Sequence, residues 1–238
     1  MSNFDGMCKH ILVVLFAIGI MGCASTNNIE PENSEDMKKE NKSYLALGDS
    51  YTIGTSIAFP DNFPNQLVDS LFSKTGDSVE VKIVAQNGWR TDDLHRGIKR
   101  TDLEDKYDLV SLLIGVNNQY QGLPLADFEK DFRSLVDTAI KYAGGDKSNI
   151  FVVSIPNYGY TPFGADKKEE ITSDLEKFNA SSKTICEELG IDFYNITEIS
   201  LEAETNAEFR ATDDLHPSAT QYAAWVDSFL DRVIKKLE

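Results

Sequence analysis

Short apolar runs alternate along this chain with longer stretches in which apolar residues recur every three or four positions. The short runs are rich in β-branched residues and predict strands at residues 44–47, 79–85, 109–114, 150–155 and 191–194. The periodic stretches predict amphipathic helices at residues 63–73, 125–142, 169–189 and 218–237. This alternation predicts a single α/β domain with a mainly parallel, five-stranded sheet and helices on both faces.

The N-terminal part of the chain does not follow this alternation. An apolar run at residues 11–21 is too short to span about 30 Å of hydrocarbon and fits the central region of a secretory signal. The sequence Ile20-Met21-Gly22-Cys23 resembles a bacterial lipobox, in which the cysteine becomes the lipidated first residue of the mature protein. The alternative is an ordinary cleaved signal in which Cys23 has no role.

The pattern therefore divides the chain into three parts. We expect a signal peptide of the lipoprotein type at residues 1–22 and a flexible tether at residues 23–42 that begins with lipidated Cys23. The tether has almost no large apolar residue, so the folded domain is expected at residues 43–238. A lipid anchor at Cys23 predicts a location in the bacterial cell envelope, at the outer membrane if the host is Gram-negative.

Charge narrows the set of partners. The chain has 39 acidic and 23 basic residues and a formal net charge of −16. This charge argues against nucleic acid, whose binding needs a basic face, and against electrostatic adsorption to anionic lipid. We expect a monomer that binds no nucleic acid and reaches the membrane through its anchor. After cleavage Cys186 is the only cysteine besides Cys23, so the domain has no disulfide partner for it.

Four groups of polar or small residues follow the predicted strands or precede the last helix. Gly48-Asp49-Ser50 follows the first strand, Gly88 the second and Gly115-Val116-Asn117-Asn118 the third, and Asp213-Asp214-Leu215-His216 leads into the final helix. Functional loops of parallel α/β sheets gather at the carboxyl ends of the strands. We therefore expect these four groups to lie at one edge of the sheet.

The first and last groups have the chemistry of a serine nucleophile and its base. A serine hydroxyl attacks a carbonyl only when a neighbouring base takes its proton, and beyond the signal peptide the chain has only His95 and His216. Asp213, three residues before His216, has the right offset to reach the imidazole Nδ1 on a tight turn, whereas Asp214 should project elsewhere. His95 belongs to a short polar helical pattern and is expected at the surface.

The two middle groups offer donors to a developing oxyanion. Hydrolysis of an ester puts negative charge on the former carbonyl oxygen, and one preorganised donor is worth roughly 3 kcal/mol. The candidate donors are the backbone N–H groups of Ser50 and Gly88 and the side-chain amide of Asn117.

With these residues, the chain from about residue 43 to 237 resembles the SGNH hydrolases, also called GDSL-type lipases and esterases. Ser50 matches the nucleophile of that family and Gly88 and Asn117 its oxyanion residues, while Asp213 and His216 match its last block. The third block usually reads Gly-x-Asn-Asp, and this chain has Asn118 at the last place.

The resemblance implies a three-layer α/β/α sandwich of flavodoxin-like type, an open site, no metal and no cofactor. The sequence itself offers no cluster of histidines or cysteines for a metal. We predict a serine-dependent hydrolase that cleaves carboxylic esters of the lysophospholipase type through an acyl-enzyme intermediate.

Two alternatives remain open. One is a carbohydrate or peptidoglycan O-acetylesterase with the same triad, for which the aromatic loop 157–164 offers rings that could stack on a sugar. The other is a glycan-binding lipoprotein without activity, supported only by Asn118.

Overall fold

The computed structural model describes residues 41–238. The predicted signal peptide 1–22, the predicted lipidated Cys23 and almost all of the predicted tether lie outside the described residues. The first strand begins at Lys42, one residue before the predicted start of the domain. No helix of the described part is long and apolar enough to cross a membrane.

Five strands form one sheet in the part of the chain that the structure describes. Their bounds are Lys42–Gly48 (β1), Val79–Ala85 (β2), Leu109–Leu113 (β3), Ile150–Val153 (β4) and Asp192–Tyr194 (β5). The strands lie in the order β2-β1-β3-β4-β5 and every pairing is parallel. The predicted five-stranded α/β fold is confirmed.

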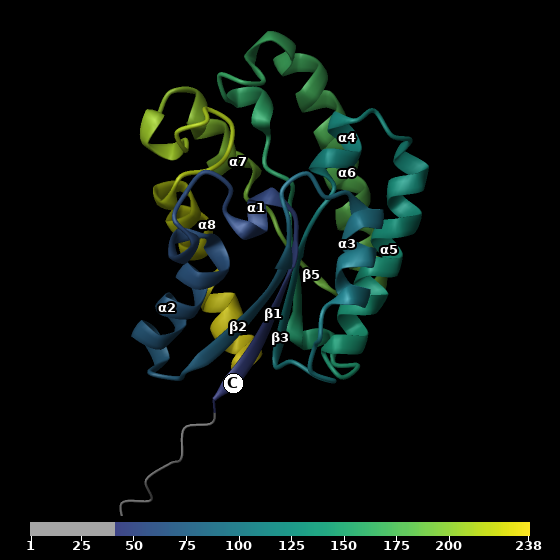
Figure 1. Cartoon of the computed structure of the whole chain (residues 1–238), viewed down its shortest axis with the longest axis vertical. Coiled ribbons are helices and arrows are strands. Elements are labelled where there is room, and N and C mark those ends of the chain that lie inside the picture. Colours follow the sequence, from purple (N-terminus) through teal and green to yellow (C-terminus); the bar gives the residue numbers. More distant parts are fainter. Residues whose placement is uncertain (1–40) are drawn as a thin grey trace, which may run out of the picture. The chain divides into compact units, whose positions relative to one another are not determined.

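Helices cover both faces of this sheet (Figure 1). They are Ser50–Ile53 (α1), Phe63–Thr75 (α2), Thr91–Arg100 (α3), Val116–Tyr120 (α4), Leu125–Tyr142 (α5), Lys168–Leu189 (α6), Thr197–Leu201 (α7) and Ala219–Leu237 (α8). Single 3₁₀ turns lie at Phe59–Asp61, Lys147–Asn149, Tyr158–Tyr160, Ala165–Lys167, Glu202–Glu204 and Ala207–Phe209. Helices α2 and α8 pack together on one face, and α3, α5 and α6 cover the other. The result is the three-layer sandwich that the family resemblance implied.

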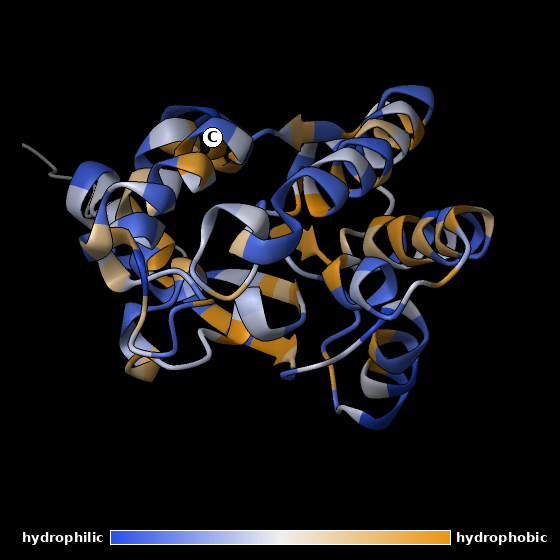
Figure 2. Ribbon diagram, turned by 90° about the horizontal axis from the view of Figure 1, so that it is seen from above, coloured by the Kyte–Doolittle hydropathy of each residue, from blue (hydrophilic) through white to orange (hydrophobic). Residues whose placement is uncertain are grey.

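Burial along the strands agrees with their places in the sheet. All residues of β3 and β4 are buried, whereas the edge strand β2 is buried only at Val79 and Val84 and exposed at Glu80 and Lys82. Strands covered on both faces by helices need continuous apolar sequence, and an edge strand does not. Seen from above, the strands are largely apolar and the helices turn polar residues outward (Figure 2).

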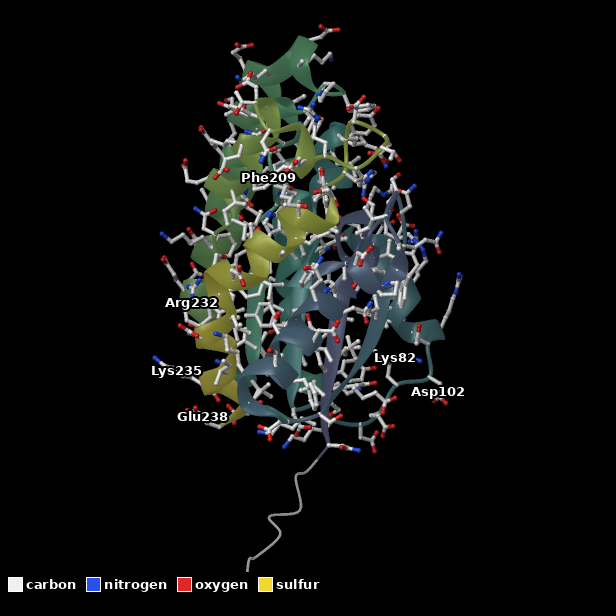
Figure 3. All side chains as sticks on the ribbon, turned by 90° about the vertical axis from the view of Figure 1, so that its left-hand side faces the viewer. Lys82, Asp102, Phe209, Arg232, Lys235 and Glu238 are labelled. Atoms are coloured by element: carbon white, nitrogen blue, oxygen red, sulfur yellow. The ribbon has the colours of Figure 1, made fainter. Side chains whose placement is uncertain are left out.

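The last helix shows how a polar start and an amphipathic pattern fix its position. The Ser218 hydroxyl accepts a hydrogen bond from the Gln221 backbone N–H and so caps α8. The buried side of α8 includes Trp225, which packs against the α2 residue Phe63. Charged side chains such as Arg232 lie on the outward side of the helix (Figure 3).

The register of the sheet aligns the carboxyl ends of β1, β2 and β3, and so brings the loops that follow them to one edge of the sheet. Gly48 at the end of β1 lies opposite Ala85 of β2 and Leu113 of β3. The chain moves from β1 to β2 on one side and later to β3 on the other, so the loops after β1 and β3 flank a topological switch point. Ligands of open α/β sheets bind at such points.

Candidate active site

Ser50 stands at the junction between β1 and α1. Gly48, at the end of β1, packs closely against β3, because a Cβ at Gly48 would lie 2.5 Å from the carbonyl oxygen of Leu113. Asp49 caps α1 by accepting a hydrogen bond from the Tyr51 backbone N–H at 3.0 Å. Ser50 is the first residue of α1, so its own N–H has no carbonyl one turn earlier to bind. Its side chain is largely buried, which restricts the direction in which the hydroxyl points.

Asp213 and His216 form a hydrogen-bonded pair in a tight turn. The Asp213 Oδ2 and His216 Nδ1 atoms are 2.6 Å apart. The other oxygen, Oδ1, accepts from the backbone N–H groups of Leu215 at 3.0 Å and His216 at 2.9 Å. Asp214 has a φ of 55°, and its carboxylate points toward Arg210 at 3.7 Å. Asp213 is therefore the partner of His216, and Asp214 projects elsewhere, as the spacing predicted.

Hydrogen bonds to Asp213 keep its carboxylate charged. Partial burial raises the pKa of Asp213, but this is outweighed by the Ser56 hydroxyl and by the donors of His216 and Leu215, which hold the pKa well below its usual range. The Ser56 Oγ atom donates to Asp213 Oδ2 at 2.6 Å. A charged Asp213 accepts a hydrogen bond from Nδ1 and so favours the tautomer of His216 whose Nε2 is an acceptor.

Two contacts join the segment after Ser50 to this pair. Besides the bond from Ser56 to Asp213, the Tyr51 ring lies against the His216 ring, with centroids 5.5 Å apart. The Tyr51 backbone carbonyl in turn accepts a hydrogen bond from the Tyr222 hydroxyl at 2.8 Å. Within residues 41–238 no hydrogen bond joins the Ser50 hydroxyl to His216, which is common for catalytic pairs without bound substrate.

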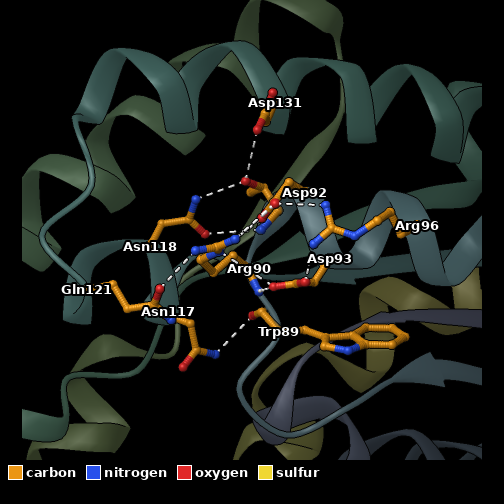
Figure 4. A network of polar contacts seen from close by, with 10 residues as sticks. Trp89, Arg90, Asp92, Asp93, Arg96, Asn117, Asn118, Gln121 and Asp131 are labelled. Atoms are coloured by element: carbon orange, nitrogen blue, oxygen red, sulfur yellow. Dashed lines mark hydrogen bonds and ion pairs between the residues drawn. The ribbon is translucent and has the colours of Figure 1, made fainter.

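Asn117 and Gly88 approach each other from the loops after β3 and β2. The Asn117 side-chain amide donates one of its two hydrogens to the Trp89 carbonyl at 2.9 Å (Figure 4). Gly88 is exposed, has a φ of 81° and has open space where a Cβ would stand. Its N–H makes no backbone hydrogen bond within the described residues. Within residues 41–238 the second amide hydrogen of Asn117 and the N–H of Gly88 have no hydrogen-bond partner.

Asn118 lies buried behind Asn117 and holds the start of α3. Its Oδ1 accepts from the Thr91 backbone N–H at 3.1 Å, and its Nδ2 donates to Thr91 Oγ1 at 2.9 Å. The Thr91 hydroxyl then donates to Asp131 Oδ2 on α5 at 3.3 Å (Figure 4). Each side-chain group of Asn118 has a partner, so the departure from Gly-x-Asn-Asp leaves no unsatisfied polar atom there.

An arginine makes the second link between α3 and α4. The Arg90 guanidinium binds both oxygens of Asp92 at 3.0 Å and donates to Gln121 Oε1 at 3.0 Å (Figure 4). Its backbone N–H donates to Asp93 Oδ2 at 3.1 Å, and Arg96 pairs with both Asp92 and Asp93. These bonds hold the loop with Gly88 against the helix with Asn117.

Asp49 is an ionisable group buried directly beside Ser50. It is fully buried, and its Oδ2 has no hydrogen-bond partner within the described residues. Burial raises the pKa of Asp49 from 3.8 to about 7, although the backbone N–H groups of Tyr51, Asp49 itself and Gly115 favour the charged form. Asp49, next to Ser50 in the chain, therefore changes charge near neutral pH.

The aromatic loop 157–164 borders this site. The Tyr158 hydroxyl donates to Gln119 Oε1 on α4 at 2.9 Å, and the Phe163 backbone N–H donates to the Asp214 carbonyl at 3.3 Å. The loop thus contacts both the helix of Asn117 and the turn of His216. The cavity between Tyr51, Tyr158 and His216 has a volume of only about 10 Å³.

The structure separates His95 from these residues. His95 lies on α3, where its Nε2 is 3.3 Å from the Asp131 carbonyl oxygen of α5. The described residues contain no group of three or more histidine, cysteine, aspartate or glutamate side chains placed to hold a metal ion. Sequence reasoning missed Ser56, which lies far from Asp213 along the chain and belongs to no recognisable motif.

Comparison with known proteins agrees with this geometry. Residues 46–224 match the GDSL-like lipase and acylhydrolase family. No curated protein matches the chain.

Solved structures of similar fold have low sequence identity to the chain. A lipase from a goat rumen metagenome has a TM-score of 0.69 at 16% identity, covering 83% of this chain and 100% of its own. An acetylxylan esterase from Geobacillus stearothermophilus has 0.64 at 21%, covering 83% and 96%. An esterase from Pseudoalteromonas sp. has 0.63 at 16%, covering 82% and 98%. At these identities the likeness is one of fold.

Proposed function

The chain belongs to the GDSL-like lipase and acylhydrolase family and is an ester hydrolase, and we propose that it cleaves carboxylic esters through an acyl-enzyme intermediate on Ser50. The observation that carries this proposal is the 2.6 Å pairing of His216 Nδ1 with Asp213 Oδ2 in the turn that contacts Ser56 and Tyr51.

Acylation uses both halves of the site. The Ser50 Oγ atom attacks the ester carbonyl carbon while His216 Nε2 takes the hydroxyl proton, and Asp213 stabilises the resulting imidazolium. The N–H groups of Ser50 and Gly88 and the Asn117 amide bind the oxyanion. Collapse of the tetrahedral intermediate expels the alcohol, which receives the proton from His216.

Deacylation repeats these steps with water. His216 takes a proton from water, the hydroxide attacks the acyl carbon, and the same three donors bind the second oxyanion. The acid then leaves and Ser50 regains its proton from His216. Each proton taken up in the cycle is returned, so the reaction consumes only ester and water.

The acyl part of the substrate is proposed to be short. The similar structures include a lipase and an acetylxylan esterase, so this fold serves both lipid and glycan esters. We take the acetyl group of the acetylxylan esterase as the guide and propose that this chain removes acetyl and similarly small acyl groups.

Substitution of the nucleophile tests the proposal. Ser50→Ala should lower turnover of p-nitrophenyl acetate by more than about 10⁴-fold, because the acyl-enzyme cannot form. Ser173→Ala, an exposed serine on α6, is the matched control and should keep full activity. Turnover by a folded Ser50→Ala chain equal to that of the parent would overturn the mechanism.

The envelope location remains a proposal, since it rests on residues 1–42. We propose that Cys23 carries lipid and tethers a monomeric domain to the membrane. Cells expressing the chain with an alkyne-bearing fatty acid should incorporate label, and Cys23→Ala should abolish it. Equal labelling of both chains would contradict an anchor at Cys23.

A further inference from the structure

Two large aromatic side chains near the proposed active site are exposed, although the third ring that both of them contact is buried. Tyr120, at the end of α4, is 60% exposed, and Phe163, in the aromatic loop, is 52% exposed. Their ring centroids are 6.1 Å apart, and both rings contact buried Tyr158 from the same loop. An exposed pair of rings held in place by a buried third ring has little conformational freedom to lose on binding a ligand.

These rings line an open cavity of about 500 Å³. Its floor includes Ile171 of α6, and its rim includes the carboxylates of Asp166, Glu170 and Asp174. A cavity with an apolar floor and a few polar groups at the rim is typical of a small-molecule site. Carboxylates accept hydrogen bonds and cannot donate them when charged, so this rim suits a ligand rich in hydroxyl groups.

The cavity adjoins the residues proposed to carry out hydrolysis. Tyr120 lies three residues after Asn117 on the same short helix. Phe163 is joined through its N–H to the carbonyl of Asp214, in the turn that ends at His216. Tyr158 lines both this cavity and the small cavity of His216, so a ligand on the two rings is separated from the His216 cavity by one side chain.

We propose that Tyr120 and Phe163 form a sugar-binding subsite and that the substrate is a short-chain ester on a carbohydrate hydroxyl. A sugar ring presents C–H faces that pack on aromatic rings and hydroxyls that donate to the carboxylate rim. The aromatic cavity receives the alcohol part of the ester. This inference rests on the proposed ester hydrolysis by Ser50.

The charge of the cavity rim favours a neutral sugar over an anionic lipid surface as the ligand. The carboxylates of Asp166, Glu170 and Asp174 outnumber the single lysine of the rim, Lys167. Anionic lipid head groups would be repelled by this rim, whereas neutral sugar hydroxyls would be bound.

The test measures hydrolysis by the full chain of acetate esters with and without a sugar ring. Acetate release is followed from O-acetylated oligosaccharides of xylose and of N-acetylglucosamine and from ethyl acetate, which has no sugar ring. Tyr120→Ala and Phe163→Ala should each raise KM for at least one sugar ester by about three- to tenfold more than for ethyl acetate. Phe72→Ala removes a ring of similar exposure, 60%, on α2, and should change KM neither for the sugar esters nor for ethyl acetate.

The outcomes separate this inference from the proposed function. Ser50-dependent release of acetate from ethyl acetate, with equal losses on both substrates in the two ring variants, would overturn the sugar subsite alone. Faster hydrolysis of lysophospholipid in vesicles than of either sugar ester would also overturn it. If the parent chain hydrolysed none of these esters, that result would instead contradict the proposed function itself.

Discussion

At the scale of single residues, the turn of Asp213 and His216 is bound by a serine that no motif contains. The Ser56 hydroxyl and His216 Nδ1 both bind the same oxygen, Asp213 Oδ2, at 2.6 Å. Ser56 has a φ of 69°, a conformation that L-residues seldom adopt. The backbone of Ser56 is therefore strained, and its conformation places the Ser56 hydroxyl against the Asp213 carboxylate.

Removal of this hydroxyl should weaken the base without moving the nucleophile. Ser56→Gly accepts the positive φ and deletes only the donor, so kcat for p-nitrophenyl acetate should fall by about three- to tenfold. Ser56→Ala deletes the same donor and keeps the strain, so it should lose additional stability in urea. A Ser56→Gly chain with unchanged kcat would show that the bond to Asp213 does not matter for turnover.

The sequence identified residues whose chemistry is local and missed those that depend on distant contacts. Asp213 and His216 are three apart, so their pairing follows from the spacing alone. Ser56 is brought to Asp213 only by the folded sheet, across a separation of 157 residues. Tyr120 was missed for a similar reason, because its exposure depends on how the aromatic loop packs against α4.

At the scale of elements, three helices meet through one hydroxyl. Thr91 of α3 receives a hydrogen bond from Asn118 of α4 and donates one to Asp131 of α5. The direction of these bonds requires a donor at position 118, because the threonine hydroxyl has a single proton and gives it to Asp131. The amide at Asn118 therefore fits the carboxylate at Asp131.

Asn118→Asp should destabilise the domain even though it restores the common family sequence. Two carboxylates would then compete for the Thr91 proton, at a cost of about 1–3 kcal/mol in the free energy of unfolding. Asp131→Asn in the same chain should recover most of the loss, and the four chains form a double-mutant cycle measured by urea denaturation. Strictly additive effects of the two substitutions would contradict this coupling.

Element length decided which helices could be predicted. The stretch that forms α5, Leu125–Tyr142, was predicted with its exact bounds because five turns show a clear period. Helices α1, α4 and α7 have four or five residues, too few to show one. Their positions follow from strand ends and capping groups such as Asp49, which become visible only in the folded chain.

At the scale of the whole molecule, the order of the strands assembles the site. The sheet places β1 between β2 and β3, and the register aligns their carboxyl ends. The sequence predicted this gathering from the alternation of strands and helices, and the fold confirms the parallel sheet that it requires. The full strand order was not derivable from periodicity, because the polar positions of β2 mark an edge strand but β3 and β4 are both largely apolar and read alike.

Global stability should depend on pH through Asp49. Its pKa is raised from 3.8 to about 7 in the folded chain, so between these values the native state keeps a proton that the unfolded chain releases. The free energy of unfolding should therefore fall as pH rises from about 4 to about 7, by at most about 4 kcal/mol. Asp213 acts oppositely, since its depressed pKa gives stability that is lost as pH falls below about 4.

Asp49→Asn isolates the first effect. The amide keeps an acceptor for the Tyr51 N–H and does not titrate, so stability measured in urea should become nearly constant between pH 4.5 and 7. Asp227→Asn, on the exposed side of α8, controls for the loss of one charge. If the parent and the Asp49→Asn chain decline equally with pH, the buried carboxyl is not the cause.

The central claim is that Ser50 is the nucleophile of an ester hydrolase, and covalent labelling tests it most directly. The full chain is treated with a fluorophosphonate, which forms a stable adduct only with an activated serine, and the modified peptide is located by mass spectrometry. We predict one adduct per chain, on Ser50, with none after His216→Ala. An adduct on another serine, or no adduct on folded protein, would contradict the account.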